Sequence, residues 1–411
     1  MRILLLTQLF EPEPNFLKGL RFAQFLQERG HSVQVLTGFP NYPGGRIYPG
    51  HSVRLFHREV LGGVEVLRVP HYPSHDRSSA RRIASYVSFA LSAALLGTPR
   101  LRRPDVIHVY QGPATLMVAA AVVARRHRAR VVLDIQDLWP ESVTGSGMLG
   151  SAAGLRALEA FCRWTYRRAT RIVVLSEAFK DRLVELGVKP DKVDVVYNWC
   201  DETAAAATGS TTGLDLDRLM PRDNRYVVYA GSFGPLQNLG AVIDAARILA
   251  PSAGRIRLVL VGDGIEADAL RLQVESLGLS NVVLVPRQPA HEVARILARA
   301  DALLVHLKDH PLSRGAVPQK VQAYLAAGRP IVIGSAGEAA TLVERAGAGV
   351  RCRPGDPADI AGAIGRLMAL PEDEREAMGR SGAEYYRQHL SFARGSERME
   401  QVFQLAASEA A

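Results

Sequence analysis

The apolar residues follow two patterns that take turns along the chain, and each pattern predicts one kind of element. Short apolar runs such as Arg2–Thr7 and Arg130–Ile135 are typical of buried parallel strands. Between them, apolar residues recur three or four positions apart, as in Phe16–Arg29, which predicts helices with one buried face. The expected strands of the first half are Arg2–Thr7, Ser32–Thr37, Arg54–Glu59, Val64–Val69, Val106–Tyr110, Arg130–Ile135, Arg171–Leu175 and Val193–Val196. The expected helices there are Phe16–Arg29, Arg81–Leu96, Gly112–Arg125, Gly154–Arg167 and Lys180–Leu186.

A segment poor in large apolar residues, Asp201–Thr212, is expected to be a linker, and the same alternation resumes beyond it. The expected strands of the second half are Tyr226–Ala230, Ile256–Val261, Val282–Val285, Ala302–His306 and Pro330–Gly334. The expected helices are Leu239–Leu249, Ile265–Leu277, His291–Ala300, a helix from Pro318 to just before Gly328, Pro357–Leu370 and Glu374–Leu390.

Regular alternation of strand and helix predicts the α/β class, here two tandem, doubly wound, Rossmann-like domains. We expect them to cover residues 1–203 and 204–390, with residues 391–411 as a C-terminal segment. Parallel sheets of this kind bind ligands beyond the carboxyl ends of their strands. The expected site is therefore a cleft that the two domains face.

Charge is unevenly distributed between the two halves. Residues 1–200 hold 27 Lys and Arg against 16 Asp and Glu (+11), whereas the remainder holds 23 against 25 (−2), which together give the net +9. A basic half predicts a polyanionic partner. Because no motif indicates nucleic-acid binding, we expect an anionic membrane surface. The run Ile83–Gly97, flanked by arginines, could lie in a membrane interface or form a core helix, and both interpretations remain open.

The N-terminus lacks the pattern of a signal peptide, and no apolar run reaches the roughly 18 residues of a spanning helix. The three cysteines are few and widely spaced, which fits a reducing compartment. We therefore expect a cytoplasmic protein. Its 47% hydrophobic content is typical of a globular chain, and no pair of histidines has metal-ligand spacing, so no metal site is expected.

Candidate chemistry follows three expected strands. Asp137 and Glu141 lie just past Arg130–Ile135, where they could orient a substrate. Alternatively, Asp137 or Ser142 could merely cap the following segment. In the second half, glycine-rich turns at 231–234 and 262–264 each end a strand before a helix. Such turns admit a phosphate close to backbone N–H groups, although each alone is also an ordinary tight turn. With Lys320 at a third helix start, they favour an anionic ligand. The first strand lacks the dinucleotide fingerprint, which argues against an oxidoreductase.

Taken together, the spaced motifs resemble the retaining, nucleotide-sugar-dependent glycosyltransferases of family 4, which have the GT-B fold. The resemblance is strongest to the subgroup of bacterial surface-polysaccharide and O-antigen biosynthesis. The motifs are Pro12-Glu13-Pro14, Glu28–Val33, Phe39–Gly45, Asp137–Ser142, Tyr197–Trp199, Gly231–Gly234, Val261–Gly264 and Ser313–Pro330.

The resemblance implies that the second domain binds a nucleotide-diphosphate sugar, most often a UDP-sugar, and that the first binds the acceptor. A hexosyl or N-acetylhexosaminyl group would pass with retention to a lipid-linked saccharide, without a cofactor or a required metal. A C-terminal helix near Glu397–Ser408 would cross back to the first domain. The implied donor-binding residues are Ser232, Phe233, Gly234, Gln237, Gly262, Gly264, Arg287, Arg314, Val317, Pro318 and Gln322. The implied acceptor-binding residues are Glu13, Asn15, Asn41 and Tyr42, and the catalytic candidates are Asp137, Glu141 and Lys320.

This chain departs from the family pattern at the donor site. The family's two glutamates, which have seven residues between them, fall on Gly315 and Ala323, and its pyrophosphate-binding Arg and Lys fall on Ser232 and Gln237. Lys320 and Arg314 are then the nearest cations for the leaving diphosphate.

The sequence does not decide which group is the general base or what the acceptor is. The family's His-Asp pair appears as Gln136-Asp137, so either Asp137 or the donor phosphate could accept the acceptor proton. Two other functions stay open: transfer to a small soluble acceptor, and a non-catalytic binding or scaffold role.

Overall fold

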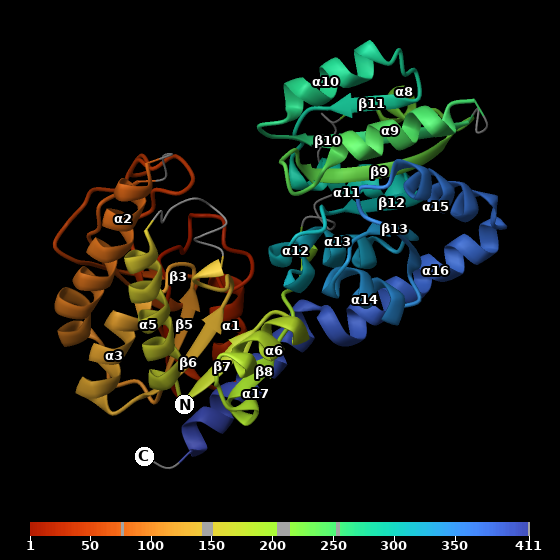
Figure 1. The fold of residues 1–411 in the computed structure, drawn as a ribbon. Helices are drawn as coiled ribbons and strands as arrows, with labels where there is room; N and C mark the ends of the chain where they lie inside the picture. Colours follow the sequence, from red (N-terminus) through yellow and green to blue (C-terminus); the bar gives the residue numbers. More distant parts are fainter. Residues whose placement is uncertain (75–77, 142–150, 204–213, 252–254, 410–411) are drawn as a thin grey trace. The chain divides into compact units, whose positions relative to one another are not determined.

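The computed structural model describes residues 1–74, 78–141, 151–203, 214–251 and 255–409 (Figure 1). The chain divides into two compact units: Met1–Tyr197 with Ser396–Ala411, and Asn198–Gly395. Each unit contains one β-sheet with helices packed on it. The fold is thus the expected pair of parallel-sheet α/β domains. Most of the predicted linker 201–212 lies outside the described residues.

The first unit is built on an eight-stranded sheet of order β3-β4-β2-β1-β5-β6-β7-β8, parallel throughout except that β3 runs antiparallel to β4. Its strands are β1 (Arg2–Leu6), β2 (Ser32–Gly38), β3 (His57–Leu61), β4 (Val64–Val69), β5 (Val106–Gln111), β6 (Arg130–Ile135), β7 (Arg171–Val174) and β8 (Val193–Val195). Its helices include α1 (Leu20–Glu28), α2 (Ser79–Ser92), α3 (Leu116–His127), α5 (Ala152–Arg168), α6 (Glu177–Glu185) and α17 (Phe392–Ser408), which enters this unit at Ser396.

Strand β5 shows how the two faces of this sheet differ. Ile107 and Val109 point into the core that also contains Phe89 of α2 and Met117 of α3. Because side chains alternate along a strand, His108 points to the other face. There its ring lies 5.4 Å from that of Phe403 in α17. The sheet is therefore buried on both sides, which explains its continuous apolar strands.

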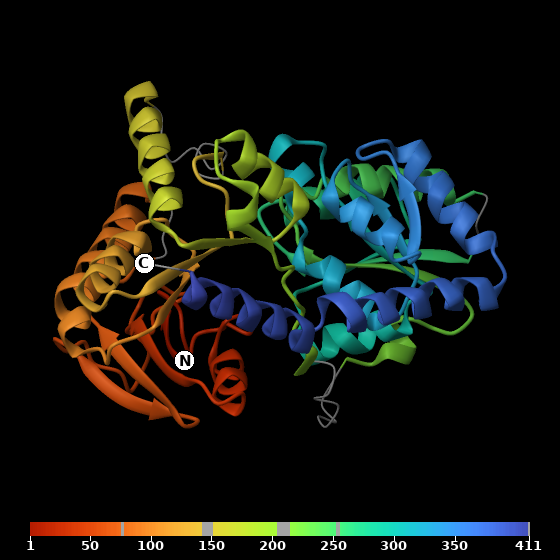
Figure 2. The same ribbon diagram turned by 90° about the horizontal axis from the view of Figure 1, so that it is seen from below.

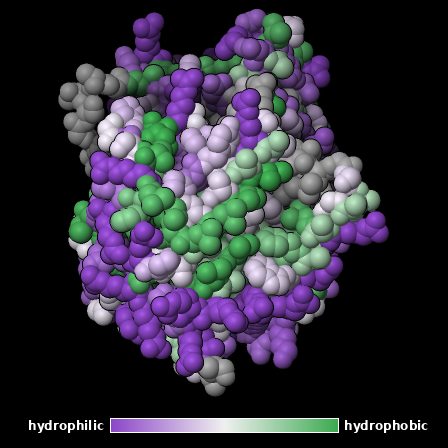
Figure 3. All heavy atoms as spheres, turned by 90° about the vertical axis from the view of Figure 1, so that its left-hand side faces the viewer, coloured by the Kyte–Doolittle hydropathy of each residue, from purple (hydrophilic) through white to green (hydrophobic). Residues whose placement is uncertain are grey.

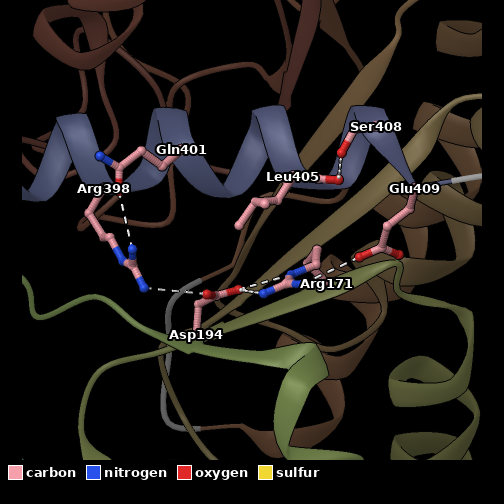
Figure 4. A network of polar contacts seen from close by, with 7 residues as sticks. All are labelled: Arg171, Asp194, Arg398, Gln401, Leu405, Ser408 and Glu409. Carbon is pink, nitrogen blue, oxygen red and sulfur yellow. Dashed lines mark hydrogen bonds and ion pairs between the residues drawn. The ribbon is translucent and has the colours of Figure 1, made fainter.

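The last helix of the chain, α17, is held against the first unit by ion pairs (Figure 2, blue). Buried Glu400 accepts a hydrogen bond from His31 Nε2 at 2.9 Å and one from Arg29 Nε at 3.0 Å. Just past the end of α17, Glu409 forms an ion pair with Arg171 of β7 (3.4 Å), which is also paired with Asp194 of β8 (2.7 Å) (Figure 4). These contacts join three separate parts of the sequence to one helix.

The second unit is built on a six-stranded, all-parallel sheet of order β11-β10-β9-β12-β13-β14. Its strands are β9 (Arg225–Ser232), β10 (Ile256–Asp263), β11 (Val282–Val285), β12 (Ala302–His306), β13 (Ile331–Gly334) and β14 (Gly349–Cys352). Its helices are α8 (Leu216–Leu219), α9 (Leu239–Leu249), α10 (Ala267–Ser276), α11 (Ala290–Arg299), α12 (Pro311–Gly315), α13 (Gln319–Ala327), α14 (Glu338–Arg345), α15 (Pro357–Ala369) and α16 (Glu372–Tyr385). Apolar side chains of α9 and α15 fill the core against β9 and β10.

Several boundaries differ from the sequence-based expectation. The hairpin strand expected at Arg54–Glu59 is His57–Leu61, because its register is set by pairing with β4. The helix expected from Phe16 begins only at Leu20. Strand β14 and helices α12 and α14 were not expected, since they are short and carry little periodic signal. Pro318 is the residue before α13 and not its first helical residue.

Candidate functional site

Two adjacent strand ends of the second unit come within atomic contact of each other. In the β9–β10 pair, Gly231 lies opposite Gly262. A side chain at Gly262 would put its Cβ 1.8 Å from the Gly231 carbonyl oxygen, and the φ of Gly262 is +156°. Only glycine fits there. The two glycine turns singled out in the sequence therefore meet at one edge of the sheet, as parallel strand ends must.

Lys320, in the first turn of α13, reaches over this edge. Its ammonium donates a hydrogen bond to Tyr229 Oη at 2.6 Å and lies 3.9 Å from the centre of that ring. A Cβ on Gly231 would lie 2.7 Å from Lys320 Nζ, so the glycine also makes room for the lysine. Burial lowers the pKa of Lys320 to about 7, and among the described residues no carboxylate offsets this effect. The ammonium is thus partly desolvated and available to an anion.

Several helices of the second unit begin at this edge without a capping side chain. Among them are α9, α13 and α14, which start after Asn238, Pro318 and Gly337; no side chain at these positions accepts a hydrogen bond from the first turn. An uncapped start leaves N–H groups and the positive end of the helix dipole for another partner. Together with Lys320, these starts give the edge a positive potential suited to phosphate oxygens.

His306, at the end of β12, connects the loops around the edge. Its Nε2 accepts a hydrogen bond from Gly355 N (2.9 Å), so its Nδ1 carries the proton and donates to Gln237 O (2.8 Å). Burial, and secondarily the charge of Lys320, lowers the pKa of this imidazole. Neutral His306 therefore links the loop after β9 to the loop after β14.

The other predicted donor residues have varied surroundings. Arg314 is exposed and forms a two-pronged ion pair with Asp309, at 2.8 and 3.1 Å. Gln322 is only 1% exposed, and its amide nitrogen, when turned toward the start of its own helix, donates to Pro318 O (2.7 Å) and Gln319 O (3.2 Å).

The remaining donor candidates differ in their solvent exposure. Phe233 and Val317 are buried, whereas Ser232 and Arg287 are exposed. Gly234 and Gln237 close a turn in which Gln237 N donates to Gly234 O at 3.0 Å. Gly264 N donates to Asp263 Oδ1 at 2.7 Å. The edge therefore presents backbone and lysine groups rather than a row of acids.

The catalytic candidates of the first unit follow β6. Asp137 keeps solvent access, and partial desolvation raises the pKa of its carboxyl above the usual range. Glu141 forms an ion pair with Arg182, with Nε and Oε1 2.9 Å apart. Ser142, the alternative to Asp137 as a capping residue, lies outside the described residues. Asp137 is thus the more accessible of the two carboxylates.

Three of the four predicted acceptor residues, Glu13, Asn41 and Tyr42, are joined by hydrogen bonds. The carboxylate of Glu13 is 2% exposed and accepts hydrogen bonds from the backbone N–H groups of Asn41 and Tyr42, both at 2.8 Å. The side chain of Asn41 contacts His71 Nε2 at 2.9 Å, and Asn15 Nδ2 donates to Leu9 O at 3.0 Å. These side chains hold the loops after β1 and β2 in place. Contact with an acceptor remains a prediction.

A buried polar cluster beneath these loops was not anticipated. His108 Nε2 lies 3.1 Å from Asp134 Oδ2, and Gln136 donates to Asp134 Oδ1 at 2.6 Å. Burial, opposed by Asp134, lowers the pKa of nearby Lys18 to about 8. No local pattern marks the contact between His108 and Asp134, because the two residues meet only through the pairing of β5 with β6. Among the described residues, no three His, Cys, Asp or Glu side chains gather as metal ligands.

Two family models match consecutive parts of this chain. The model described as "Glycosyl transferase 4-like domain" matches residues 20–199, nearly all in the first unit, and the one described as "Glycosyl transferases group 1" matches residues 217–385, in the second. The two matches thus fall on the two sheets separately.

Curated relatives extend over most of the chain. The protein named "Putative colanic acid biosynthesis glycosyl transferase WcaI" of Escherichia coli (strain K12) is 27% identical over 319 residues, 75% of this chain and 77% of that protein. A D-inositol 3-phosphate glycosyltransferase of Acidothermus cellulolyticus is 27% identical over 374 residues, 85% of this chain and 76% of that protein.

Solved structures share the fold at lower identity. Anabaena Alr3699/HepE, in a complex with UDP-glucose, has a TM-score of 0.67 and 17% identity, covering 98% of this chain and 100% of that one. An α,α-trehalose 6-phosphate synthase from Burkholderia multivorans has a TM-score of 0.72 and 14% identity, covering 99% and 97%. At these identities the likeness concerns the fold alone, which is GT-B.

Proposed function

The chain belongs to the glycosyltransferases that combine a family 4-like N-terminal domain with a group 1 domain, and we propose that it transfers a sugar from a nucleotide-diphosphate sugar with retention. The observation that carries this proposal is the desolvated ammonium of Lys320 beside the glycine turns of β9 and β10. A diphosphate there would restore the solvation that the ammonium lost on folding and would meet uncapped helix starts.

Within this proposal, Lys320 stabilises the negative charge of the leaving diphosphate, which is its largest contribution to the rate. Arg314 supplies a second positive charge when its ion pair with Asp309 opens and it binds phosphate instead. Ser232 and the backbone near Gly234 contact phosphate, and Gln322 serves the ribose after turning away from its helix start.

On the acceptor side, Asp137 and Glu141 orient the reacting groups, and Asn41 and Tyr42 lie near the acceptor. The acceptor proton passes either to Asp137 or to the departing phosphate, and the raised pKa of Asp137 suits a base.

The donor we propose is a UDP-sugar, carrying a hexosyl or N-acetylhexosaminyl group, and the acceptor a lipid-linked saccharide of surface polysaccharide assembly. Support comes from HepE, whose structure contains UDP-glucose, and from the colanic acid relative. The enzyme would work at the inner face of the cytoplasmic membrane and without a metal.

The test combines a panel of UDP- and GDP-sugars with lipid extracts, with and without EDTA, and follows nucleotide release and glycolipid formation. We expect one UDP-sugar to be consumed equally well in EDTA. Transfer only to soluble acceptors would replace the lipid-linked acceptor, and nucleotide binding without any transfer would favour a non-catalytic scaffold.

A further inference from the structure

Helix α2 of the first unit exposes a stripe of large apolar side chains. Ile83, Val87, Leu91 and Leu95 are 42%, 41%, 51% and 70% exposed. They are spaced four residues apart along α2 and the π-helical turn that follows it at Ala93–Gly97. Residues at this spacing share one face of a helix. The opposite face is buried on the sheet through Phe89 and Ala93, so the stripe is not needed to hold the helix.

The stripe is part of a larger apolar face. Val122 of the neighbouring helix α3 is 40% exposed. Figure 3 views this side of the first unit and shows apolar side chains gathered in one band, bordered by hydrophilic ones. We call the stripe together with Val122 the α2–α3 face. Contiguous apolar surface of this kind, rimmed by polar residues, is typical of an interaction site.

The two segments that form the α2–α3 face carry charges of one sign. Residues 78–104 contain five arginines and no Asp or Glu. Helix α3 also lacks acidic residues and ends in Arg125 and Arg126, which are exposed. Several of these arginines flank the apolar residues in sequence, as Arg81 and Arg82 precede Ile83. Arg102 is ion-paired with Glu65 of β4, but the two helices themselves carry no acidic residue. An apolar stripe on helices whose charges are all positive matches a lipid surface, where the apolar residues enter the acyl boundary and arginines meet phosphate groups.

We propose that the α2–α3 face docks onto the anionic headgroups of a bilayer. Among the described residues, no helix is long and apolar enough to cross a membrane. Docking would instead place α2 in the plane of the interface, with Leu91 and Leu95 inserted most deeply. The proposal builds on the proposed function, because a lipid-linked acceptor needs its enzyme at a membrane, but it can be measured without donor or acceptor.

The experiment is flotation of the full chain with vesicles of phosphatidylcholine alone or mixed with phosphatidylglycerol. We expect binding to the mixed vesicles that weakens as salt is raised. The variant Leu91→Asp/Leu95→Asp should bind at least about tenfold more weakly, since it removes apolar insertion and adds repelling charge. Ile265→Asp/Leu272→Asp, at positions 80% and 65% exposed in the second unit, is the matched control and should bind like wild type.

Each other outcome overturns the proposal. Absence of vesicle binding would do so even if sugar transfer to a soluble acceptor were intact. Equal binding by the Leu91→Asp/Leu95→Asp variant would show that another surface meets the lipid. A concentration-dependent dimer that this variant abolishes, without vesicle binding by wild type, would assign the face to a second copy of the chain. Unchanged thermal unfolding of both variants shows that they fold.

Discussion

Replacing Lys320 by methionine should make the protein more stable and nearly inactive at once. The side chain keeps its length but loses the ammonium that burial holds at a pKa of about 7 instead of the ordinary 10.5. The unfolded chain binds this proton more tightly than the folded one. Burial of Lys320 therefore costs stability below pH 7, and this cost disappears as pH rises toward 10.5.

The size of the effect follows from this difference in pKa. At about 1.4 kcal/mol per pH unit, the cost below pH 7 would reach about 4–5 kcal/mol. Lys320 is only half-buried, and the hydrogen bond to Tyr229 is lost in the variant, so we expect a net gain of about 1–3 kcal/mol. The gain should be visible as a higher Tm near neutral pH and should vanish in alkaline buffer.

Transfer should respond in the opposite direction. Loss of one preorganised charge at a leaving diphosphate costs about 100-fold or more in kcat. The assay is UDP release from the donor at saturating acceptor, with Tm measured on the same preparations. Lys189→Met, at an exposed lysine of the first unit, is the control and should change neither quantity. If Lys320→Met kept transfer within about threefold of wild type, Lys320 would not serve the diphosphate.

Three further substitutions test other parts of the structure. Gly262→Ala should lower both Tm and affinity for UDP, because its Cβ would meet the Gly231 carbonyl; a variant with wild-type binding would refute the contact. Asp137→Asn should remove the acidic limb of the kcat/KM pH profile, which in wild type reflects protonation of a carboxyl with raised pKa, and an unchanged profile would exclude Asp137 as the base. Glu400→Gln should lower the free energy of unfolding by about 1–3 kcal/mol in urea titrations, since it weakens the bonds from His31 and Arg29, and no loss would mean that they do not anchor α17.

The fold was largely predictable because burial on both faces of a parallel sheet leaves a strong sequence signal. Apolar runs such as Arg130–Ile135 match β6 residue for residue. Edge strand β14 escaped prediction because its four residues include the exposed Arg351 and only one buried side chain, Cys352. Short helices such as α14, with eight residues, likewise carry too few turns for a clear period.

The candidate site was predictable only where chemistry followed a strand or opened a helix. The helix start carrying Lys320 was visible from Pro318 and Gly328, although α13 itself begins at Gln319. The hydrogen-bond partner of Lys320 could not be predicted, since Tyr229 lies 91 residues earlier and meets it only through packing of α13 on β9. For the same reason, no local pattern predicted that His306 would link Gln237 to Gly355.

The most direct test of the central claim is NMR observation of the complete reaction with the natural membrane lipid extract. The claim is that this chain transfers a sugar from a nucleotide-diphosphate sugar with retention. We predict that one UDP-sugar of the panel is converted to UDP and a glycolipid in equal amounts, with the anomeric configuration of the donor preserved. Inverted product would contradict the mechanism. Nucleotide binding with no product from any donor or acceptor would contradict the assignment as a transferase.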